Sequence, residues 1–497
     1  MKLLWKILGA LLLLACLPLF AFGEEAKDVS SVELVTESQG FSHLGSLFDR
    51  NRTSGYKTGD QASLTVEYPE GFGSAYLIFD REYGEFTVTD PDTGESHTVG
   101  QENFLHTFLD LENLFGFCPE KLTFTFDNGP APLLELTLFT QGTVPDWVQR
   151  WEAPAENGTD LALFSTHADD EQLFFAGILP YYAGELDYRV QVIYLTNHRN
   201  LSKDPNLRCH EALNGLWAVG VRNYPVFGSF GDYFSRNEKD AIGLFHYQGV
   251  EQEELLGYVV EQLRRFKPLV AVGHDLNGEY GHGAHMLYAD LLTQAVELSA
   301  DEGQYPESAE VYGTWDVPKL YLHLYEQDQI TMDWDRPLDC FDGMTAYQVT
   351  KELGFPCHAS QVQDFAWYMA GVENAADIQK YSPCLFGLYR STVGEDVEKQ
   401  DFFEHLSTYA QQEQARLEEQ AKLEEQARLE EQAKQEAAAR QAELARQQTA
   451  PAADPTQAPD QIPADAYLSP PIWPIVLSLT MILAAGAALV FLWRRKK

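Results

Sequence analysis

Hydrophobic and polar positions divide the chain into a β-rich part and a part in which strands alternate with helices. In the first part, short apolar runs at 63–68, 75–80 and 133–139 are separated by turn-forming clusters. Short strands at regular spacing, with turn residues between them, are typical of two packed antiparallel sheets. We therefore predict an all-β sandwich as an accessory domain over residues 24–148.

The second part alternates between the two kinds of periodicity. We expect strands at 161–166, 190–195 and 269–273, and helices at 211–218, 251–266 and 284–298. Strands that alternate with helices form parallel sheets covered by helices. This pattern predicts an α/β fold over residues 155–398, with a Rossmann-like, mostly parallel sheet and helices on both faces.

A charged six-residue repeat begins at residue 414, within the segment 400–448. Because six residues at about 100° each leave about 240° beyond a full turn, Leu417, Leu423 and Leu429 point in three directions and form no heptad seam. Glutamates followed four residues later by lysine or arginine stabilise a helix. We predict a single charged helix that serves as a spacer, with a coiled-coil dimer as the alternative, and a flexible linker at 449–471.

Both ends of the chain carry apolar segments. Residues 1–23 combine two lysines, an apolar run and a small-x-small ending, as in a secretory signal peptide, and a lipoprotein signal ending at Cys16 is the alternative. The segment 472–493 is long enough to cross a bilayer and precedes four basic residues at 494–497. These segments predict a single-pass cell-membrane protein with its N-terminal part outside the cell and a cytoplasmic C-terminus.

Charge and cysteine content narrow the possible functions. The formal net charge of −40 argues against nucleic acid as a partner, because a phosphate backbone requires a basic surface. Five cysteines lie beyond residues 1–23, scattered and without the CxxC spacing of a sulfur-ligated zinc site. We expect no disulfide framework.

The first candidate site follows the strand predicted at 161–166. His167 and Asp170 lie three residues apart in the turn after this strand, a spacing at which both side chains can reach one ion. Sites form at the carboxyl ends of strands in open α/β sheets, and imidazole and carboxylate ligands suit Zn²⁺ at about 2.0–2.2 Å. Asp169 lies beside these ligands, free to accept a proton from metal-bound water.

The second candidate site follows the strand predicted at 269–273. His282 and His285 are again three residues apart, at the start of a predicted helix and after glycines that permit tight turns. Two clusters of histidine and aspartate on strand-to-helix turns of one sheet are difficult to explain as core residues. Together they predict one metal site.

These two motifs resemble those of the PIG-L/LmbE-like zinc N-deacetylases, whose pattern is a strand ending in HPDDE and a later HxxH. The resemblance covers about 240 residues and extends to the segments 194–197, 208–211 and 218–221. It implies that Zn²⁺ is bound by three residues, namely His167, Asp170 and His285. It also implies that Asp169 is the general base, and that His282 stabilises the oxyanion or supplies a proton. Members of the family remove acetyl groups from N-acetylglucosamine units of small glycosides and glycolipids.

The chain departs from the family pattern at two positions. Ala168 replaces the usual proline of the first motif, which loosens the loop without removing a ligand. Ala284 stands where many members carry an aspartate beside the histidines, so another group must orient His282. Asp275 and Glu279 are the candidates for this role.

Five further residues are candidates for binding substrate, namely His198, Arg199, Arg208, His358 and Arg390. Each has a structural alternative, such as a helix-face ion pair for Arg208 or a packed core position for His358. In the N-terminal part, residues 47–53 resemble the opening of a discoidin-like, galactose-binding-like sandwich. This second resemblance implies a glycan-binding module, with a structural accessory domain as the alternative.

The combined prediction is a membrane-anchored extracellular enzyme. It would use Zn²⁺ to hydrolyse the acetamide of N-acetylglucosamine-type glycans, so that its partner is an N-acetylated carbohydrate. Two alternatives are a zinc amidase acting on another small N-acyl compound and a surface glycan-binding protein with an inactive deacetylase fold.

Overall fold

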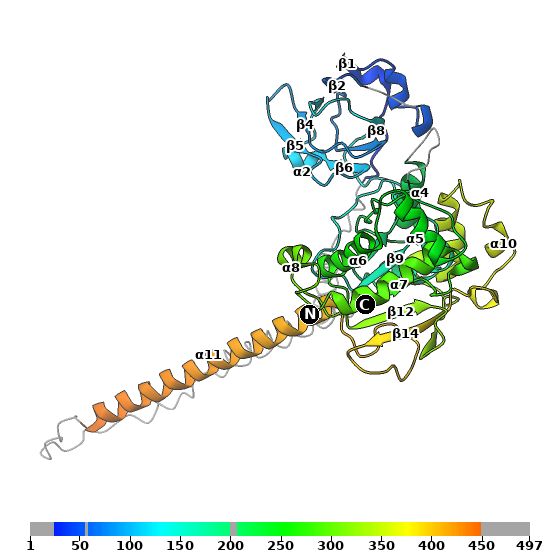
Figure 1. Ribbon diagram of the computed structural model, residues 1–497. Coiled ribbons are helices and arrows are strands. Elements are labelled where there is room, and N and C mark those ends of the chain that lie inside the picture. Colours follow the sequence, from blue (N-terminus) through cyan, green and yellow to red (C-terminus); the bar gives the residue numbers. More distant parts are fainter. Residues whose placement is uncertain (1–23, 55–57, 199–205, 449–497) are drawn as a thin grey trace, which may run out of the picture. The chain divides into compact units, whose positions relative to one another are not determined.

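The computed structural model describes residues 24–54, 58–198 and 206–448 (Figure 1). Contacts between Cα atoms group Met1–Arg416 into one compact unit and Leu417–Lys497 into a second. The first unit contains both the β-rich part and the part in which strands and helices alternate.

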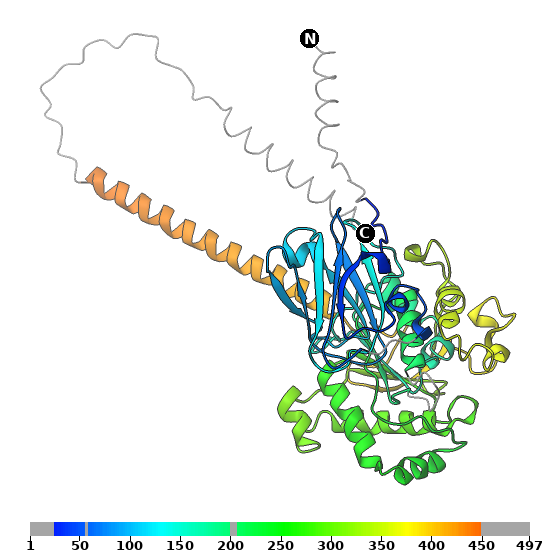
Figure 2. The same ribbon diagram turned by 90° about the horizontal axis from the view of Figure 1, so that it is seen from above.

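The β-rich part is a sandwich of two antiparallel sheets, whose strands run from blue to cyan in Figure 2. One sheet has the order β1 (Val35–Gln39), β2 (Ala62–Glu67), β7 (Lys121–Phe126), β4 (Phe86–Thr89) and β5 (Ser96–Val99). The other has the order β6 (His106–Asp110), β3 (Ser74–Phe79) and β8 (Leu133–Phe139), and α2 (Leu111–Phe115) follows β6. In β7, buried and half-buried side chains alternate, as expected when one face of a strand faces the core. The structure therefore has the all-β sandwich that the sequence predicts.

A six-stranded, mostly parallel sheet forms the centre of the α/β part. Its order is β10 (Val190–Tyr194), β9 (Leu161–Ser165), β11 (Val270–Gly273), β12 (Lys319–His323), β14 (Leu385–Ser391) and β13 (Gln329–Thr331). The first four strands are parallel to one another, whereas β14 is antiparallel to both of its neighbours. The predicted Rossmann-like sheet is confirmed.

Helices cover both faces of this sheet because its strands are apolar on both sides. Leu161 and Leu163 belong to a core that includes α4 (Leu207–Ala218). Ala162 and Phe164 belong to a second core that includes α6 (Gln252–Phe266) and α7 (Gly283–Leu298). The helices of this part are α3 (Asp170–Leu173), α4 (Leu207–Ala218), α5 (Glu238–Tyr247), α6 (Gln252–Phe266), α7 (Gly283–Leu298), α8 (Pro306–Tyr312), α9 (Ala346–Val349) and α10 (Ala366–Met369). Strands with two buried faces are typical of parallel sheets.

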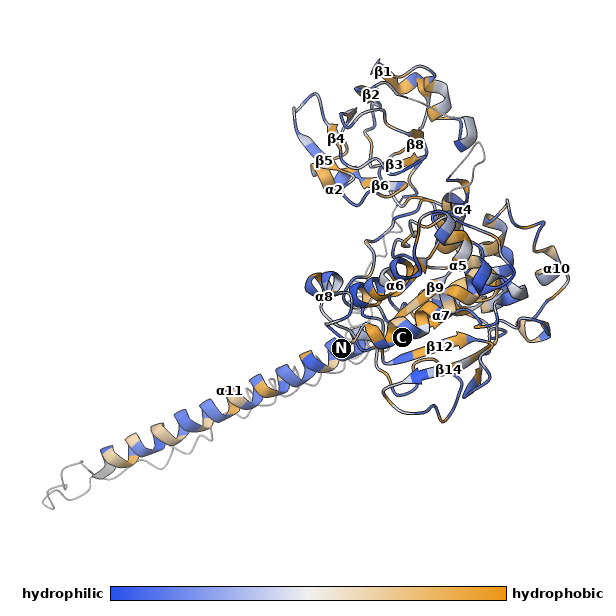
Figure 3. Ribbon diagram, viewed as in Figure 1, coloured by the Kyte–Doolittle hydropathy of each residue, from blue (hydrophilic) through white to orange (hydrophobic). Residues whose placement is uncertain are grey.

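The charged repeat forms one helix, α11 (Tyr409–Gln448), with polar residues along its whole length (Figure 3). Leu417, Leu423 and Leu429 are all exposed on it. The helix begins later than the predicted start at residue 400. The reason is that Phe402 and Phe403 are buried, and both rings lie against the ring of Tyr182.

The predicted localisation needs a correction. In the three described ranges, no helix has both the length and the apolar character that a bilayer crossing requires. The described residues therefore do not support the predicted single-pass membrane location. The predicted signal peptide at 1–23, linker at 449–471, membrane helix at 472–493 and basic tail at 494–497 lie outside the described residues.

Candidate active site

Histidines follow or end all four parallel strands at one edge of the sheet. His167 comes two residues after β9, His198 four residues after β10 and His274 directly after β11, and His323 is the last residue of β12. All four are buried. Since β9 has β10 on one side and β11 on the other, the chain reverses its direction of winding here. This arrangement places the histidines at the position where open α/β sheets bind ligands.

The three predicted metal ligands converge on one point. His167 Nδ1 lies 3.0 Å from Asp170 Oδ2 and 3.1 Å from His285 Nε2, and the last two atoms are 3.2 Å apart. Two ligands of one tetrahedral Zn²⁺ with bonds of about 2.0–2.1 Å lie about 3.3–3.4 Å from each other. The donor atoms of His167, Asp170 and His285 therefore fit a shared metal ion.

The remaining ring nitrogens of the two histidines support the same interpretation. His285 donates from Nδ1 to Glu279 Oε2 at 2.7 Å, and His167 Nε2 lies 3.2 Å from Asp232 Oδ1. A histidine that binds a metal usually donates its other N–H to a carboxylate or carbonyl, which orients the ring and raises its basicity. Both rings therefore turn their free nitrogen toward Asp170.

His274 lies near the same point but does not have a free nitrogen. Its Nε2 accepts a hydrogen bond from the Thr166 N–H at 3.0 Å, and its Nδ1 donates to Glu279 at 2.9 Å. With both nitrogens engaged, His274 is a structural support for the turn after β9. The geometry therefore favours His167 over His274 as the ligand that joins Asp170 and His285, although His274, Asp170 and His285 also lie close enough to share an ion.

Glu279 is the carboxylate on which the second turn depends. It is fully buried and contacts three imidazoles, since His323 Nδ1 lies 2.7 Å from its Oε1 in addition to the contacts of His274 and His285. Although burial opposes ionisation, these histidines hold the pKa of Glu279 well below its usual range. The sequence suggested Glu279 as a support for His282, but the structure places it against the other three histidines.

The ionisation of the proposed ligands is set by their neighbours. Burial lowers the pKa of His167, but Asp232 and Asp170 together raise it to about 10. Burial likewise opposes a charged His285, whose pKa Asp170 and Glu279 raise to about 9. Burial also opposes ionisation of Asp170, yet His285 and His167 hold its pKa well below the usual range. The site is therefore one in which positive charge is stabilised, as a metal cation requires.

Side chains hold the backbone of the first turn in place. The N–H of His167 donates to Asp170 Oδ2 at 2.9 Å, that of Ala168 to His198 Nε2 at 2.7 Å, and that of Asp169 to Glu171 Oε2 at 2.9 Å. Asp169 has a φ of 131°, which is strained for a residue other than glycine. Such strain persists only where the surroundings determine the conformation, and these hydrogen bonds supply that constraint.

Asp169 is buried and paired with Arg208. The guanidinium Nη2 lies 3.1 Å from Asp169 Oδ1 and donates to the Ala168 carbonyl at 2.5 Å, while Nη1 lies 3.1 Å from Asp232 Oδ2. Burial raises the pKa of Asp169 to about 7, against the opposing effect of Arg208. A carboxylate with a pKa near the working pH is well suited to general acid–base catalysis.

His282 is a neutral imidazole beside the proposed ligands. Its ring centroid lies 4.8 Å from that of His167 and 4.6 Å from that of His285. Burial, together with His167 and His285, lowers its pKa to about 2. Its Nδ1 has no hydrogen-bond partner among the described residues, and the ring centroids of Phe234 and Tyr280 lie 5.1 and 5.5 Å from that of His282. Aromatic packing therefore takes the role that the sequence suggested for Asp275 or Glu279.

The candidates for substrate binding are placed very differently. Arg208 contacts the catalytic turn, whereas His198 supports its backbone and the buried His358 lies 2.8 Å from Glu171. Arg390 pairs with Leu320 near the start of β12, at the opposite edge of the sheet, and its guanidinium bonds Glu297, Asp316 and the Val317 carbonyl. Arg390 is therefore a structural ion-pair residue. Arg199 lies outside the described residues.

Sequence reasoning missed two residues that contact the site, Asp232 and His323. Asp232 belongs to a segment without regular secondary structure and bridges His167 and Arg208, which no local pattern indicates. His323 had a signal that could have been used, because it is a polar residue at the carboxyl end of an apolar strand.

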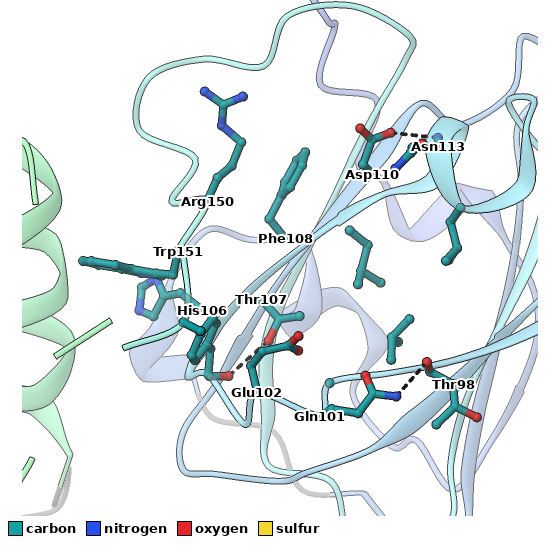
Figure 4. A pocket seen from close by; sticks show the side chains of 16 residues that line it. Thr98, Gln101, Glu102, His106, Thr107, Phe108, Asp110, Asn113, Arg150 and Trp151 are labelled. Carbon is teal, nitrogen blue, oxygen red and sulfur yellow. Dashed lines mark hydrogen bonds between the residues drawn. The ribbon is translucent and has the colours of Figure 1, made fainter. Parts of the chain in front are cut away.

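A hollow of about 480 Å³ lies away from this edge, between the sandwich and the segment that follows it (Figure 4). Arg150 and Trp151 line it together with β6 residues such as His106 and Phe108. His106 Nε2 lies 2.9 Å from His210 Nδ1 of α4, so this histidine joins the sandwich to the α/β part. The candidate metal ligands do not line this hollow, which leaves the sheet edge as the candidate active site.

Comparison with known proteins adds sequence relatives to this geometry. No family model matches the chain. The 1D-myo-inositol 2-acetamido-2-deoxy-alpha-D-glucopyranoside deacetylase 1 of Catenulispora acidiphila is 27% identical over 182 residues, which are 32% of this chain and 54% of that protein. The match thus spans about half the length of this relative. The deacetylase of the same name from Rhodococcus erythropolis is 26% identical over 289 residues, 49% of this chain and 96% of that protein.

Solved structures match the chain only at low scores. The 4-carboxy-2-hydroxymuconate hydratase GalB from Pseudomonas putida has a TM-score of 0.29 at 18% identity, over 48% of this chain and 99% of its own. The N,N'-diacetylchitobiose deacetylase from Pyrococcus horikoshii has a TM-score of 0.32 at 12% identity, over 47% of this chain and 83% of its own. The curated sequence relatives are N-deacetylases by name, and they support the resemblance of this chain to the PIG-L/LmbE-like deacetylases.

Proposed function

We propose that this protein is a zinc-dependent N-deacetylase that hydrolyses the acetamide of N-acetylglucosamine-type sugars. The observation that carries the proposal is the convergence of His167, Asp170 and His285 within 3.2 Å of one another, with the carboxylate of Asp169 in the same turn. The names of the curated relatives, which specify a 2-acetamido-2-deoxyglucopyranoside, support the substrate class.

His167, Asp170 and His285 would hold the metal ion. Three protein ligands leave a position open, as catalytic zinc sites require. A bound Zn²⁺ supplies Lewis acidity, which polarises a carbonyl oxygen and lowers the pKa of a bound water from 15.7 toward about 7.

Asp169 is the general base in this proposal. Its carboxylate accepts a proton from the attacking water, and its pKa of about 7 allows the same group to return that proton to the leaving nitrogen. Arg208 keeps the carboxylate oriented through the contact at Oδ1 and holds the adjacent Ala168 carbonyl. The products are acetate and a sugar with a free amine.

His282 is the proposed donor to the oxyanion that forms when the acetamide carbonyl is attacked. A neutral imidazole can donate one hydrogen bond, and a single oxyanion donor contributes about 2.7–4 kcal/mol in other enzymes. The stacking of Tyr280 on His282 restricts the imidazole ring before the substrate arrives. Such preorganisation is what makes an oxyanion donor effective.

The proposal is tested by acetate release from the purified protein. The metal is removed with a chelator and Zn²⁺ is added back, and acetate is measured with N-acetylglucosamine, its small glycosides and a panel of N-acetylated amines without a sugar. We expect zinc-dependent hydrolysis of the sugars and little hydrolysis of the other amides. Hydrolysis of the simple amides alone would identify an amidase of a different substrate class. Zinc binding without hydrolysis of any compound would contradict the catalytic role.

A further inference from the structure

A row of aromatic side chains in contact, here called the aromatic ridge, passes through His282 and ends at an exposed ring on each side. It consists of Phe234, His282, Tyr280, Phe365 and Trp367. Consecutive ring centroids are 5.1, 5.5, 5.9 and 6.5 Å apart. The ridge joins the turn before α7 to the segment around α10, which is distant in the sequence.

The two ends of this aromatic ridge are exposed. Phe234 is 65% exposed and Trp367 is 55% exposed, although both rings lie within this chain of contacts. Large aromatic side chains are normally removed from water, because each buries 150–250 Å² when it is covered. Contiguous apolar patches larger than those of an ordinary surface mark interaction sites, and ligand sites are lined mainly by hydrophobic and aromatic side chains.

The outer end of the ridge is firmly anchored. Trp367 lies 5.6 Å from the buried Tyr368, whose hydroxyl donates to the Tyr381 carbonyl at 2.5 Å. Phe365 packs against the buried Phe174, with centroids 6.5 Å apart. Because its neighbours are fixed, Trp367 can bind a ligand without a large entropic cost of ordering the surface.

We propose that this aromatic ridge binds the sugar units that flank the reacting N-acetylglucosamine, so that the preferred substrate is a glycan of two or more units. A pyranose ring presents an apolar face of C–H groups, which packs on an aromatic ring in the way that two apolar surfaces do. This inference rests on the proposed deacetylase function and specifies its substrate class.

The test uses the full chain loaded with Zn²⁺ and three substrates, namely N-acetylglucosamine and its β-1,4-linked dimer and tetramer. Acetate release gives kcat/KM for each sugar. We expect kcat/KM of the unaltered protein to rise with chain length. In Trp367→Ala we expect the ratio of the tetramer value to the monomer value to fall about 3–10-fold, mainly through KM. Trp367→Phe should restore most of this ratio.

Two further variants complete the test. Phe234→Ala, at the opposite end of the ridge, should also lower the ratio, and it keeps the experiment decisive if Trp367→Ala does not fold. Tyr247→Ala removes an aromatic ring that is 85% exposed at the end of α5 and should leave the ratio unchanged. Acetate release that does not depend on chain length, or a ratio unaffected by both ridge variants, would overturn the ridge and leave the deacetylase function intact. Absence of acetate release from all three sugars would overturn the deacetylase function and this inference together.

Discussion

Two buried groups of the sandwich, His106 and Glu135, have pKa shifts opposite to those of His167 and Glu279 in the α/β part. In the sandwich, burial lowers the pKa of His106 to about 3, and burial together with Asp49 raises that of Glu135 to about 7. Both shifts favour the neutral form. In the α/β part, the shifts of His167 and Glu279 favour the charged form, because opposite charges lie within hydrogen-bond distance.

This difference separates a structural core from the core that holds the proposed active site. Burial of an isolated charge is costly, so a group without an oppositely charged partner becomes neutral instead. A cluster of buried groups that keep their charge must be held together by complementary partners, and such clusters concentrate at functional sites. The charged cluster at the carboxyl edge of the α/β sheet therefore supports the proposed site there, where the shifts of Asp169 and His282 instead favour the neutral form.

The largest effect is expected from a change at the proposed general base. Asp169→Asn should lower kcat by about 10²–10⁴-fold, since this is the usual contribution of a positioned acid–base group. The metal content, measured by elemental analysis, should be retained because Asp169 is not among the proposed ligands. A variant that loses its metal in proportion to its activity would assign Asp169 to metal binding instead. Asp170→Asn provides the matched control, in which both quantities should fall.

A smaller effect is expected from Glu279→Gln. The glutamine oxygen can replace Oε2, which contacts His274 and His285, or Oε1, which contacts His323, but the NH₂ group cannot accept on the other side. The loss of charge also weakens the interaction that orients His285. Changes to residues that support metal ligands usually lower metal affinity about 10–100-fold. Competition with a chelator would measure this loss. Unchanged zinc affinity would show that the buried charge of Glu279 serves only the stability of the fold.

Ala168 stands where the related motif carries a proline, and its backbone N–H donates to His198. This hydrogen bond predicts the effect of replacing Ala168 with proline. Ala168→Pro removes the donor to His198 Nε2 and leaves that buried nitrogen unpaired, which costs about 1–3 kcal/mol. We expect a lower midpoint of thermal unfolding, whereas Ala168→Ser keeps the N–H and should change it much less. An unchanged midpoint in the proline variant would mean that His198 does not depend on this bond.

The smallest effect is expected in the sandwich and depends on pH. Glu135 has a pKa of about 7 in the folded protein and 4.5 as its ordinary value, so the folded state binds more protons between these values and stability falls as pH rises through this window. The side chain of Glu135→Gln stays neutral at every pH. At pH 8 the free energy of unfolding of this variant should exceed that of the unaltered protein by about 1–2 kcal/mol, which raises its unfolding temperature. At pH 4.5 the variant should not be the more stable of the two. Glu37→Gln, on the exposed part of β1, is the matched control for the removal of one carboxylate from the sandwich. A pH-independent difference would remove the contrast between the two cores.

The elements that the sequence predicted best are those whose periodicity is local. Buried strands such as β9 and β10 and the amphipathic helix α6 begin and end within a few residues of their predicted bounds. The start of α11 was predicted too early, because the burial of Phe402 and Phe403 against Tyr182 overrides the helical character of the segment. Arg390 was predicted to bind substrate because it follows a turn. The antiparallel direction of β14 instead puts Arg390 at the other edge of the sheet.

The sequence by itself determined the strand-to-helix turns and the histidines and aspartates that they carry, because these depend on neighbours within a few positions along the chain. Only the tertiary structure decided how those residues are supported. Asp232, Glu279 and His323 act across the sheet on partners that are distant in sequence, and His282 is held by two aromatic rings. Such contacts arise when separate strands end at a common edge, and no pattern within one segment contains that information.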